Sequence, residues 1–266
     1  MVESVVCLKQ VFDVSKITID TDTNKPILTG VPRKISDFDK NALEEAVKLK
    51  EAHGGSVKTV TIGETEKLTE NLREALAIGS DISYALEDKL FENLDSFGTA
   101  SVLAGAIKKL EKYDLVICGE ASIDNYAGQV GVQLAEILGV PVATYVKKVT
   151  QDGNKIKVER ALGLVTEEVE LELPAVVTVT KEINEPRLPN LMQIMGASSK
   201  PIETWSASDI GLGEGELGAD AHKMTTVDVK GVTMERKRQV YQDDDVDKGI
   251  EEIAGVLLKG GFVGGA

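Results

Sequence analysis

Histidine, cysteine and aromatic residues are all scarce in this sequence. Its 266 residues include two histidines and two cysteines, and Phe, Trp and Tyr together make up 4% of the chain. Because His53 and His222 are far apart and no Cys/His cluster is present, we expect no metal site. Cys7 and Cys118 each lie in an apolar run that is typical of a buried strand, so we expect free, structural thiols.

The chain also lacks a positive charge excess, the sequence signature of a signal peptide and a long hydrophobic run. Its net charge is -14, whereas nucleic-acid binding requires clustered Lys and Arg. No apolar stretch is long enough to cross a bilayer, and the N-terminus has no basic segment followed by an apolar one. We therefore expect a cytoplasmic protein that neither binds nucleic acid nor spans a membrane.

Short apolar runs and amphipathic segments alternate in the first part of the chain. Residues 2–8, 57–62 and 114–118 are typical of strands that are covered on both faces. Ser36 can cap a helix that ends at Gly54, a second helix runs from Thr65 to Gly79, and two more span about 98–110 and 129–138. This alternation predicts an α/β fold with a doubly wound, mostly parallel sheet.

The pattern changes after residue 141. Segments 142–150 and 156–160 flank Asp152-Gly153-Asn154, a strong hairpin signal. Residues 168–173 alternate charged and apolar side chains, and residues 175–180 form another apolar run. We predict that all of these segments are antiparallel additions to the sheet.

Beyond Trp205 the globular pattern fades. Residues 211–220 are polar and glycine-rich, as in a linker. The acidic residues 243–245 then precede an amphipathic helix whose apolar face holds Val246, Ile250, Ile253 and Leu257. We predict an α/β domain over residues 1–204 and a C-terminal arm over 205–266, whose helix covers either its own domain or a partner chain.

No set of residues typical of catalysis is present. The chain has no G-x-G-x-x-G after its first strand, no Walker-type phosphate loop and no G-x-S-x-G motif. The acidic pairs Glu44-Glu45 and Glu167-Glu168 are predicted to be exposed. The residues thus favour a nucleotide-binding or interaction domain over a self-sufficient enzyme.

Segment 114–139 is the most informative part of the chain. A predicted strand ends at Cys118-Gly119, a loop of small polar residues follows, and a helix begins around 128–131. In open α/β sheets such a turn can bind a phosphate through backbone N–H groups, with Asp124 holding ribose hydroxyls or ordering the loop. A tight connection without a ligand is the alternative.

Several separated stretches resemble the beta subunit of electron-transfer flavoproteins. They are VVCLKQV (5–11), ISDFDKNALEEAVKLKE (35–51), EALAIGSD (74–81), DLVICGEASIDNYAGQVG (114–131) and LPAVVTVTKEINEPRLPNLMQIMGA (173–197). The last is the most specific, because it matches the family's E-P-R-x-P-x-L-x-x-I-M-x-A segment. Together they cover most of residues 1–204.

The resemblance implies an adenine nucleotide alpha-hydrolase-like fold and a flavin-carrying alpha subunit as partner, held by the C-terminal arm. The dimer would carry electrons from a flavin dehydrogenase to an acceptor such as a quinone reductase. The beta subunit binds AMP in one-flavin members and FAD in bifurcating members, which also oxidise NADH. By the same resemblance, the adenine is held by Cys7, Lys9, Ser36, Ile62 and Gly119, the ribose and phosphates by Asp124, Asn125, Gln129, Val130 and Gly131, and a dehydrogenase docks on Asn190, Leu191 and Met192.

Departures from the family pattern affect these expectations. Ser36-Asp37 replaces the usual Asn-Pro, and residues 196–199 replace the usual lysine run, as in the branch associated with nitrogen fixation. The stretch 128–131 (GQVG) favours FAD, whereas 124–127 (DNYA) differs from the D-G-D-T of bifurcating members. We predict FAD, with AMP as the alternative. The alternative to a docking role for Leu191 is that its side chain packs onto its own domain.

Two other functions are compatible with such an architecture. An adenylating enzyme would need a phosphate loop where this chain has Cys7-Leu8-Lys9-Gln10, which argues against it. A stand-alone adenine-nucleotide sensor of the same fold would need no partner chain.

Overall fold

The computed structural model describes residues 1–217, 223–232 and 238–262. Contacts divide the chain into two compact units. The main unit consists of residues 1–18 and 26–229, and the second unit of residues 19–25 and 230–266.

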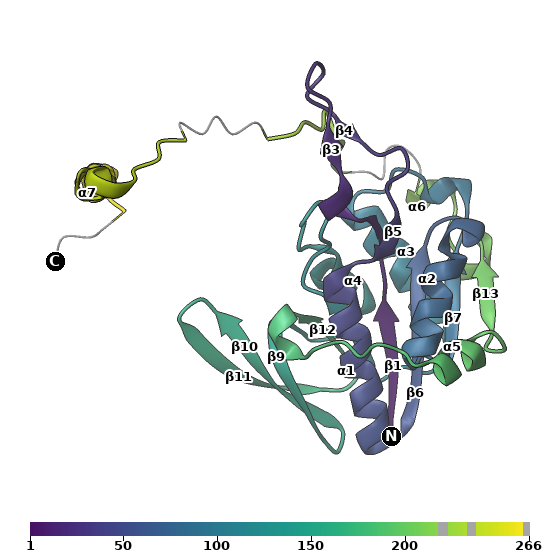
Figure 1. The fold of residues 1–266 in the computed structure, drawn as a ribbon. Coiled ribbons are helices and arrows are strands. Elements are labelled where there is room, and N and C mark those ends of the chain that lie inside the picture. The colour runs from purple at the N-terminus through teal and green to yellow at the C-terminus, as the bar shows by residue number, and fades with distance from the viewer. Residues whose placement is uncertain (218–222, 233–237, 263–266) are drawn as a thin grey trace. The chain divides into compact units, whose positions relative to one another are not determined.

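The main unit contains a nine-stranded sheet in the order β11-β10-β9-β12-β8-β1-β6-β7-β13 (Figure 1). Strands β9, β12, β8, β1, β6, β7 and β13 pair in parallel, whereas β10 is antiparallel to both β9 and β11. In chain order the bounds are β1 Val2–Cys7, β6 Gly55–Ile62, β7 Ile82–Leu86, β8 Leu115–Gly119, β9 Val142–Asp152, β10 Lys155–Leu162, β11 Val165–Glu172, β12 Ala175–Val179 and β13 Ile202–Trp205. The predicted mostly parallel α/β fold is confirmed.

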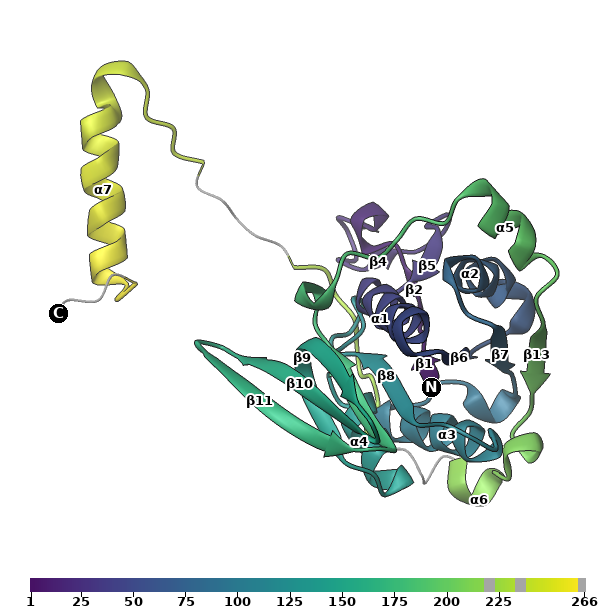
Figure 2. The same cartoon turned by 90° about the horizontal axis from the view of Figure 1, so that it is seen from below.

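Helices cover both faces of this sheet (Figure 2). They are α1 (Asp37–His53) and α2 (Thr65–Ile78) on one face, and α3 (Ser96–Lys109) and α4 (Val130–Leu138) on the other. Successive side chains of a strand point to opposite faces, so Val6 joins the core beneath α1 while Val5 joins the core beneath α3 and α4. This division explains why consecutive residues at the end of β1, Val5 and Val6, are both apolar.

Two predictions about the sheet and its surroundings are wrong. β12 is not an antiparallel addition: it lies between β8 and β9 and is parallel to both. All five of its residues are buried, as expected for an inner parallel strand. Glu44 and Glu45 are also buried rather than exposed, because the segment after β12 lies over this side of α1.

Beyond β13 the chain contributes more structure than the sequence predicts. The proposed domain boundary after residue 204 falls within β13, and the main unit extends to residue 229. In the predicted linker 211–220, residues 214–217 form the short helix α6 (Glu214–Leu217), in which Leu217 is buried. Residues 218–220 lie outside the described residues.

The second unit contains the predicted C-terminal helix, α7 (Val246–Lys259). Residues 243–245 form a 3-10 turn before it, which places the acidic cluster at the helix N-terminus. Its apolar side chains Ile250, Ile253 and Leu258 are exposed. Among the residues that the structure describes, no helix has the length and apolarity needed to cross a membrane.

Candidate functional site

A cavity of about 1050 Å³ opens at the carboxyl ends of the central strands. Its walls include the last residues of β1, β6 and β8 (Cys7, Ile62 and Gly119) and the first turns of α3 and α4. In open α/β sheets, ligands bind at this edge. Of the residues predicted to bind a nucleotide, those lining the cavity are Cys7, Lys9, Ile62, Gly119, Asn125, Gln129, Val130 and Gly131.

The N-terminus of α4 faces this cavity without a side-chain cap. Gln129 occupies the N-cap position but, within the described part of the chain, makes no capping hydrogen bond. The first N–H groups of a helix have no intrahelical acceptor, so those of α4 are available to an anion. Gly131 allows the helix to approach β12 closely, because a Cβ there would lie 2.5 Å from Thr178 Cγ2.

The neighbouring helix α3 begins differently. Asp95 caps it by accepting the Gly98 N–H at 2.8 Å. Asp95 also accepts the N–H groups of Lys223 and Met224, at 2.6 and 2.9 Å, and so holds residues 224–226 against the cavity. The Ser96 hydroxyl donates to Gln129 Oε1 at 3.1 Å and thereby connects the starts of α3 and α4.

Lys9 and Asp124 form an ion pair beside the cavity. Lys9 Nζ lies 2.8 Å from Asp124 Oδ2 and also donates to the Ser122 hydroxyl at 3.3 Å. Although burial raises the pKa of Asp124, hydrogen bonds from Lys9 and Ser122 bring it below its usual value. Asp124 is not among the lining residues, so in this structure its carboxylate orders the loop.

Ser36 is the other predicted residue that does not line the cavity. Its N–H donates to the Lys9 carbonyl at 2.9 Å, which ties the start of α1 to the turn after β1. Its side chain is fully buried at the N-cap of α1 but does not cap the helix, and its Oγ has no hydrogen-bond partner among the described residues. Direct contact between Ser36 and a nucleotide remains a prediction.

Asp39 is a cavity residue that sequence reasoning missed. Its carboxylate accepts the N–H of Lys9 at 2.7 Å and that of Gly119 at 3.2 Å. Burial raises the pKa of Asp39 to about 7, against the opposing effect of these two hydrogen bonds. The sequence signal for Asp39 was an acidic residue in the first turn of a helix that follows a strand. Such a residue more often stabilises the helix by its favourable interaction with the helix dipole.

The remaining missed residues come mainly from α3 and the segment before it. Sequence reasoning gave α3 no part in the site because its apolar spacing indicates only a core helix. The cavity residues from this region are Phe91, Asn93, Leu94, Asp95, Ser96, Thr99 and Leu103.

The two cysteines are free and buried, as predicted. Cys7 is the last residue of β1, and Cys118 is the last but one of the neighbouring strand β8. The interaction of its S–H with Cys7, together with burial, raises the pKa of the Cys118 thiol. The Cys118 thiol is therefore protonated at neutral pH. In the described ranges no group of three or more His, Cys, Asp or Glu could hold a metal ion, and His222 lies outside those ranges.

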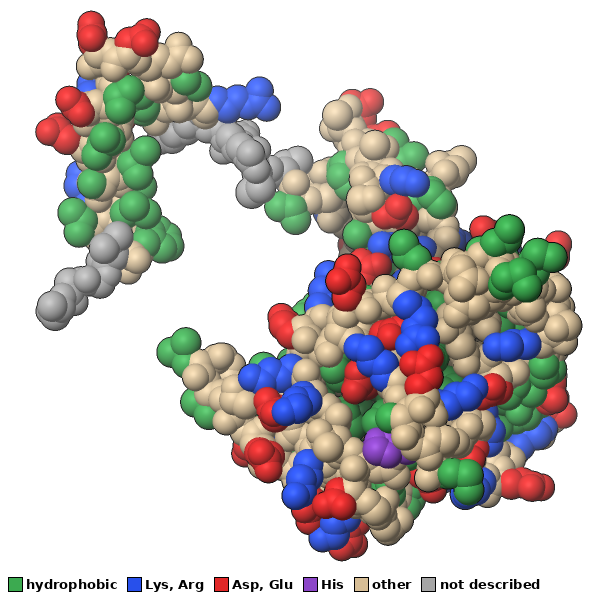
Figure 3. All heavy atoms as spheres, turned by 60° about the horizontal axis from the view of Figure 1, so that its bottom comes forward, with side chains coloured by type: hydrophobic (Ala, Val, Ile, Leu, Met, Phe, Trp, Pro, Cys, Tyr) green, Lys and Arg blue, Asp and Glu red, His purple; other side chains and the backbone are tan. Residues whose placement is uncertain are grey.

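A second exposed feature is the helix α5 (Leu191–Ala197), which contains the predicted docking residues. Asn190 caps it in a capping box with Gln193, each side chain accepting the other residue's N–H. Leu191 is 71% exposed and Met192 77% exposed, so Leu191 does not pack onto its own domain. Figure 3 shows apolar side chains gathered over this side of the main unit, where Leu188, Ile194 and Met195 are also exposed.

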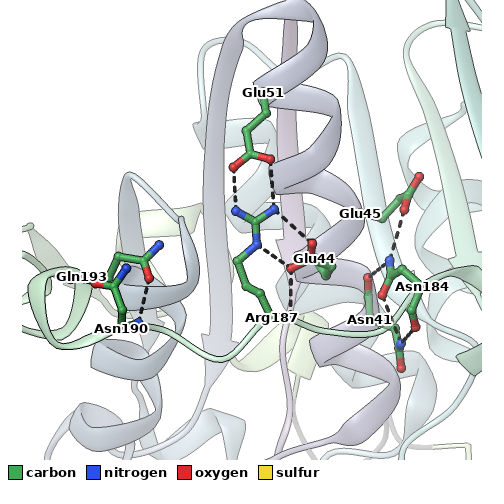
Figure 4. A network of polar contacts seen from close by, with 8 residues as sticks. All are labelled: Asn41, Glu44, Glu45, Glu51, Asn184, Arg187, Asn190 and Gln193. Carbon is green, nitrogen blue, oxygen red and sulfur yellow. Dashed lines mark hydrogen bonds and ion pairs between the residues drawn. The ribbon is translucent and has the colours of Figure 1, made fainter.

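Polar contacts fix the chain on both sides of α5. The Arg187 guanidinium bonds both oxygens of buried Glu44 at 2.8 and 3.0 Å, and those of Glu51 at 2.6 and 2.9 Å (Figure 4). After the helix, Arg73 donates to the carbonyls of Ala197 and Lys200 at 2.8 and 2.7 Å. The exposed apolar helix is therefore held in place by its flanking segments.

Comparison with known proteins identifies the family. The sequence profile of the electron transfer flavoprotein domain matches residues 25–210. The chain belongs to the electron transfer flavoprotein family. The resemblance to its beta subunit is confirmed by relatives that align over most of this chain.

Three relatives illustrate the match. "Electron transfer flavoprotein subunit beta" of Thermoanaerobacterium thermosaccharolyticum is 40% identical over 89% of this chain and 90% of its own length. The protein of the same name from Clostridium acetobutylicum is 38% identical over 96% and 95%. "Caffeyl-CoA reductase-Etf complex subunit CarD" of Acetobacterium woodii is 39% identical over 81% and 82%.

Proposed function

We propose that this chain is the beta subunit of a heterodimeric electron transfer flavoprotein and that its cavity binds an adenine nucleotide. The observation that carries this proposal is the uncapped N-terminus of α4, which faces a large cavity at the carboxyl edge of a parallel sheet. Such an N-terminus favours a phosphate group. Family membership supports electron transfer as the activity.

The residues present fit an adenine nucleotide. The N–H groups of Val130 and Gly131 bind phosphate, and Gln129, fixed by Ser96, borders the same place. Cys7, Ile62 and the backbone of Gly119 form the wall for the adenine. Lys9 lines the same adenine pocket, and Asp124 fixes the position of Lys9.

We propose FAD as the occupant, with AMP as the alternative. The cavity lies at the upper end of the roughly 300–1,000 Å³ that is typical of small-molecule sites, which leaves room for a dinucleotide. A bound flavin would accept and release electrons. The chain's own residues bind and orient the nucleotide, and we assign none of them a catalytic role.

The exposed apolar surfaces support the need for other chains. We propose that the helix α7 of the second unit packs on the alpha subunit, because apolar faces of this kind are uncommon on a free monomer. Asn190, Leu191 and Met192 would form the docking point for a flavin dehydrogenase, and a quinone reductase or similar acceptor would receive the electrons. We further propose a cytoplasmic location and the branch associated with nitrogen fixation.

Co-expression with a candidate alpha subunit tests the proposal. We expect a yellow heterodimer whose heat-released nucleotides contain FAD from the beta site in addition to the alpha-subunit flavin. One FAD and one AMP per dimer would indicate the alternative occupant. A colourless, monodisperse monomer that binds adenine nucleotide would instead support the stand-alone sensor.

A further inference from the structure

Asp39 joins the ends of two neighbouring strands at the wall of the cavity. It lies in the first turn of α1, and the residue is 6% exposed. Its Oδ2 accepts the N–H of Lys9, just beyond β1, and its Oδ1 accepts the N–H of Gly119, the last residue of β8. One helix side chain therefore links the ends of two neighbouring strands that line the cavity.

The fit between this carboxylate and β8 is close. A Cβ on Gly119 would lie 2.5 Å from Asp39 Oδ1 and 2.7 Å from Phe38 Cβ, so the position accommodates only glycine without movement. Asp37, in the same turn of α1, offers a contrast. It is much more exposed and forms an ion pair with Lys34 at 2.8 Å.

Several ionisable groups surround Asp39. Lys9 attracts its negative charge, Asp124 repels it, and the thiols of Cys7 and Cys118 lie near the ends of the two strands that it joins. Burial is the largest influence and raises the pKa of Asp39 to about 7. Near neutral pH the carboxylate is thus close to the midpoint of its titration.

Other charged residues near α1 have partners elsewhere. Lys40 pairs with Glu74 of α2 at 2.5 Å, and Lys181, from the turn after β12, lies over the Phe38 ring at 5.2 Å. Lys9 and Asp124 are therefore the charges that act on Asp39 most directly.

We propose that Asp39 is a positioning residue of the nucleotide site, whose ionised carboxylate holds Lys9 and Gly119 in the arrangement that binds the nucleotide. This inference rests on the proposed adenine-nucleotide function. Protonation places a hydroxyl hydrogen on one oxygen, where it faces an N–H donor. Asparagine places an NH₂ group there with the same result, so either change disrupts one of the two hydrogen bonds.

The test measures the affinity of the nucleotide-depleted heterodimer for FAD and for AMP by calorimetry between pH 6 and pH 8. We expect wild-type affinity to rise with pH as Asp39 ionises. Asp39→Asn should bind about tenfold more weakly at pH 8, the usual consequence of an unpaired buried donor, and should lose this dependence. Asp37→Asn, the matched control in the same turn, should behave like the wild type.

The two ligands separate the titration of the protein from that of the ligand. A phosphate monoester such as AMP itself titrates near pH 6, whereas the diphosphate of FAD has no such group. A pH dependence that appears with AMP alone, or that persists unchanged in Asp39→Asn, would overturn the inference. Failure of the wild-type heterodimer to bind either nucleotide would overturn the proposed function itself.

A second route is available if Asp39→Asn does not fold. Gly119→Ala places a methyl group against Asp39 Oδ1, and we expect it to weaken FAD binding by a similar factor. Wild-type affinity for FAD that stays constant from pH 6 to pH 8 would contradict the inference without any variant.

Discussion

The cavity and the α5 surface differ in what they bury and expose. Polar side chains are buried at the cavity, whereas apolar side chains are exposed at α5. At the cavity, the carboxylate of Asp39 is buried beside an apolar core. At α5, Leu191 and Met192 point into solvent, while Arg187 in the segment before the helix reaches inward to buried Glu44. Each region departs from the usual distribution of residues, and this departure is why we propose a binding function for each.

The largest expected change in stability concerns the ion pairs of Arg187, which fix the segment before α5. Arg187→Ala leaves the Glu44 carboxylate buried without its cation, and we expect a loss of about 3 kcal/mol in the free energy of unfolding. Urea denaturation measures it. Glu51→Gln removes the exposed half of the network and should cost less than about 1 kcal/mol. Equal losses would show that burial of Glu44 is not what matters.

The next effect is a pH dependence of stability at the cavity. The pKa of Asp39 is raised from 3.8 to about 7 in the folded chain. The protonated carboxyl of Asp39 therefore contributes its full stabilisation below pH 3.8. This contribution is lost as the pH rises through 7. Relative to Asp39→Asn, the unfolding free energy should fall by roughly 1 kcal/mol per pH unit between pH 5 and 7. A constant difference would contradict the raised pKa.

Two glycine substitutions compare how closely the cavity and the α5 surface are packed. Gly131→Ala places a methyl group against Thr178 at the cavity, and we expect about 1–3 kcal/mol of destabilisation together with weaker nucleotide binding. Gly196→Ala in α5 meets no atom within 4 Å and should stabilise the protein by up to about 1 kcal/mol. Thermal unfolding distinguishes them. Similar changes in both variants would argue against close packing at α4.

The smallest effect on stability is expected at the exposed face itself. Leu191→Ala should change the free energy of unfolding by less than about 0.5 kcal/mol, because Leu191 is largely exposed. Reduction of the heterodimer by its dehydrogenase should nevertheless slow markedly, with nucleotide content unchanged. Val227→Ala, at another exposed apolar position, is the control. Loss of nucleotide in Leu191→Ala would rule out a docking role.

Sequence periodicity predicted the elements whose burial pattern is simple. The bounds of α1, α2 and α4 and the hairpin at 152–154 differ from the structure by only one or two residues. β7 was missed because ISYAL is short and bears polar residues, and β12 was given the wrong direction because an apolar run contains no information about its neighbours. Glu44 was misplaced because its burial depends on Arg187, which is distant in sequence.

The part of the site that could be predicted consists of residues at strand ends and helix starts. Cys7, Gly119 and residues 129–131 lie at a strand end or helix start, where the fold itself brings them together. Asp39 and the first turn of α3 enter the cavity from other elements, so their contribution depends on tertiary packing. The docking residues came from family resemblance, and their exposure is consistent with that assignment.

The most direct test of the account is to locate the nucleotide on the chain. The heterodimer can be labelled by irradiation with an 8-azido-adenine nucleotide, with and without excess FAD, and its peptides identified by mass spectrometry. We expect label that FAD displaces on peptides containing residues 7–9, 62 or 119–131. Label confined to other parts of the beta chain, or unaffected by FAD, would contradict a nucleotide site in this cavity.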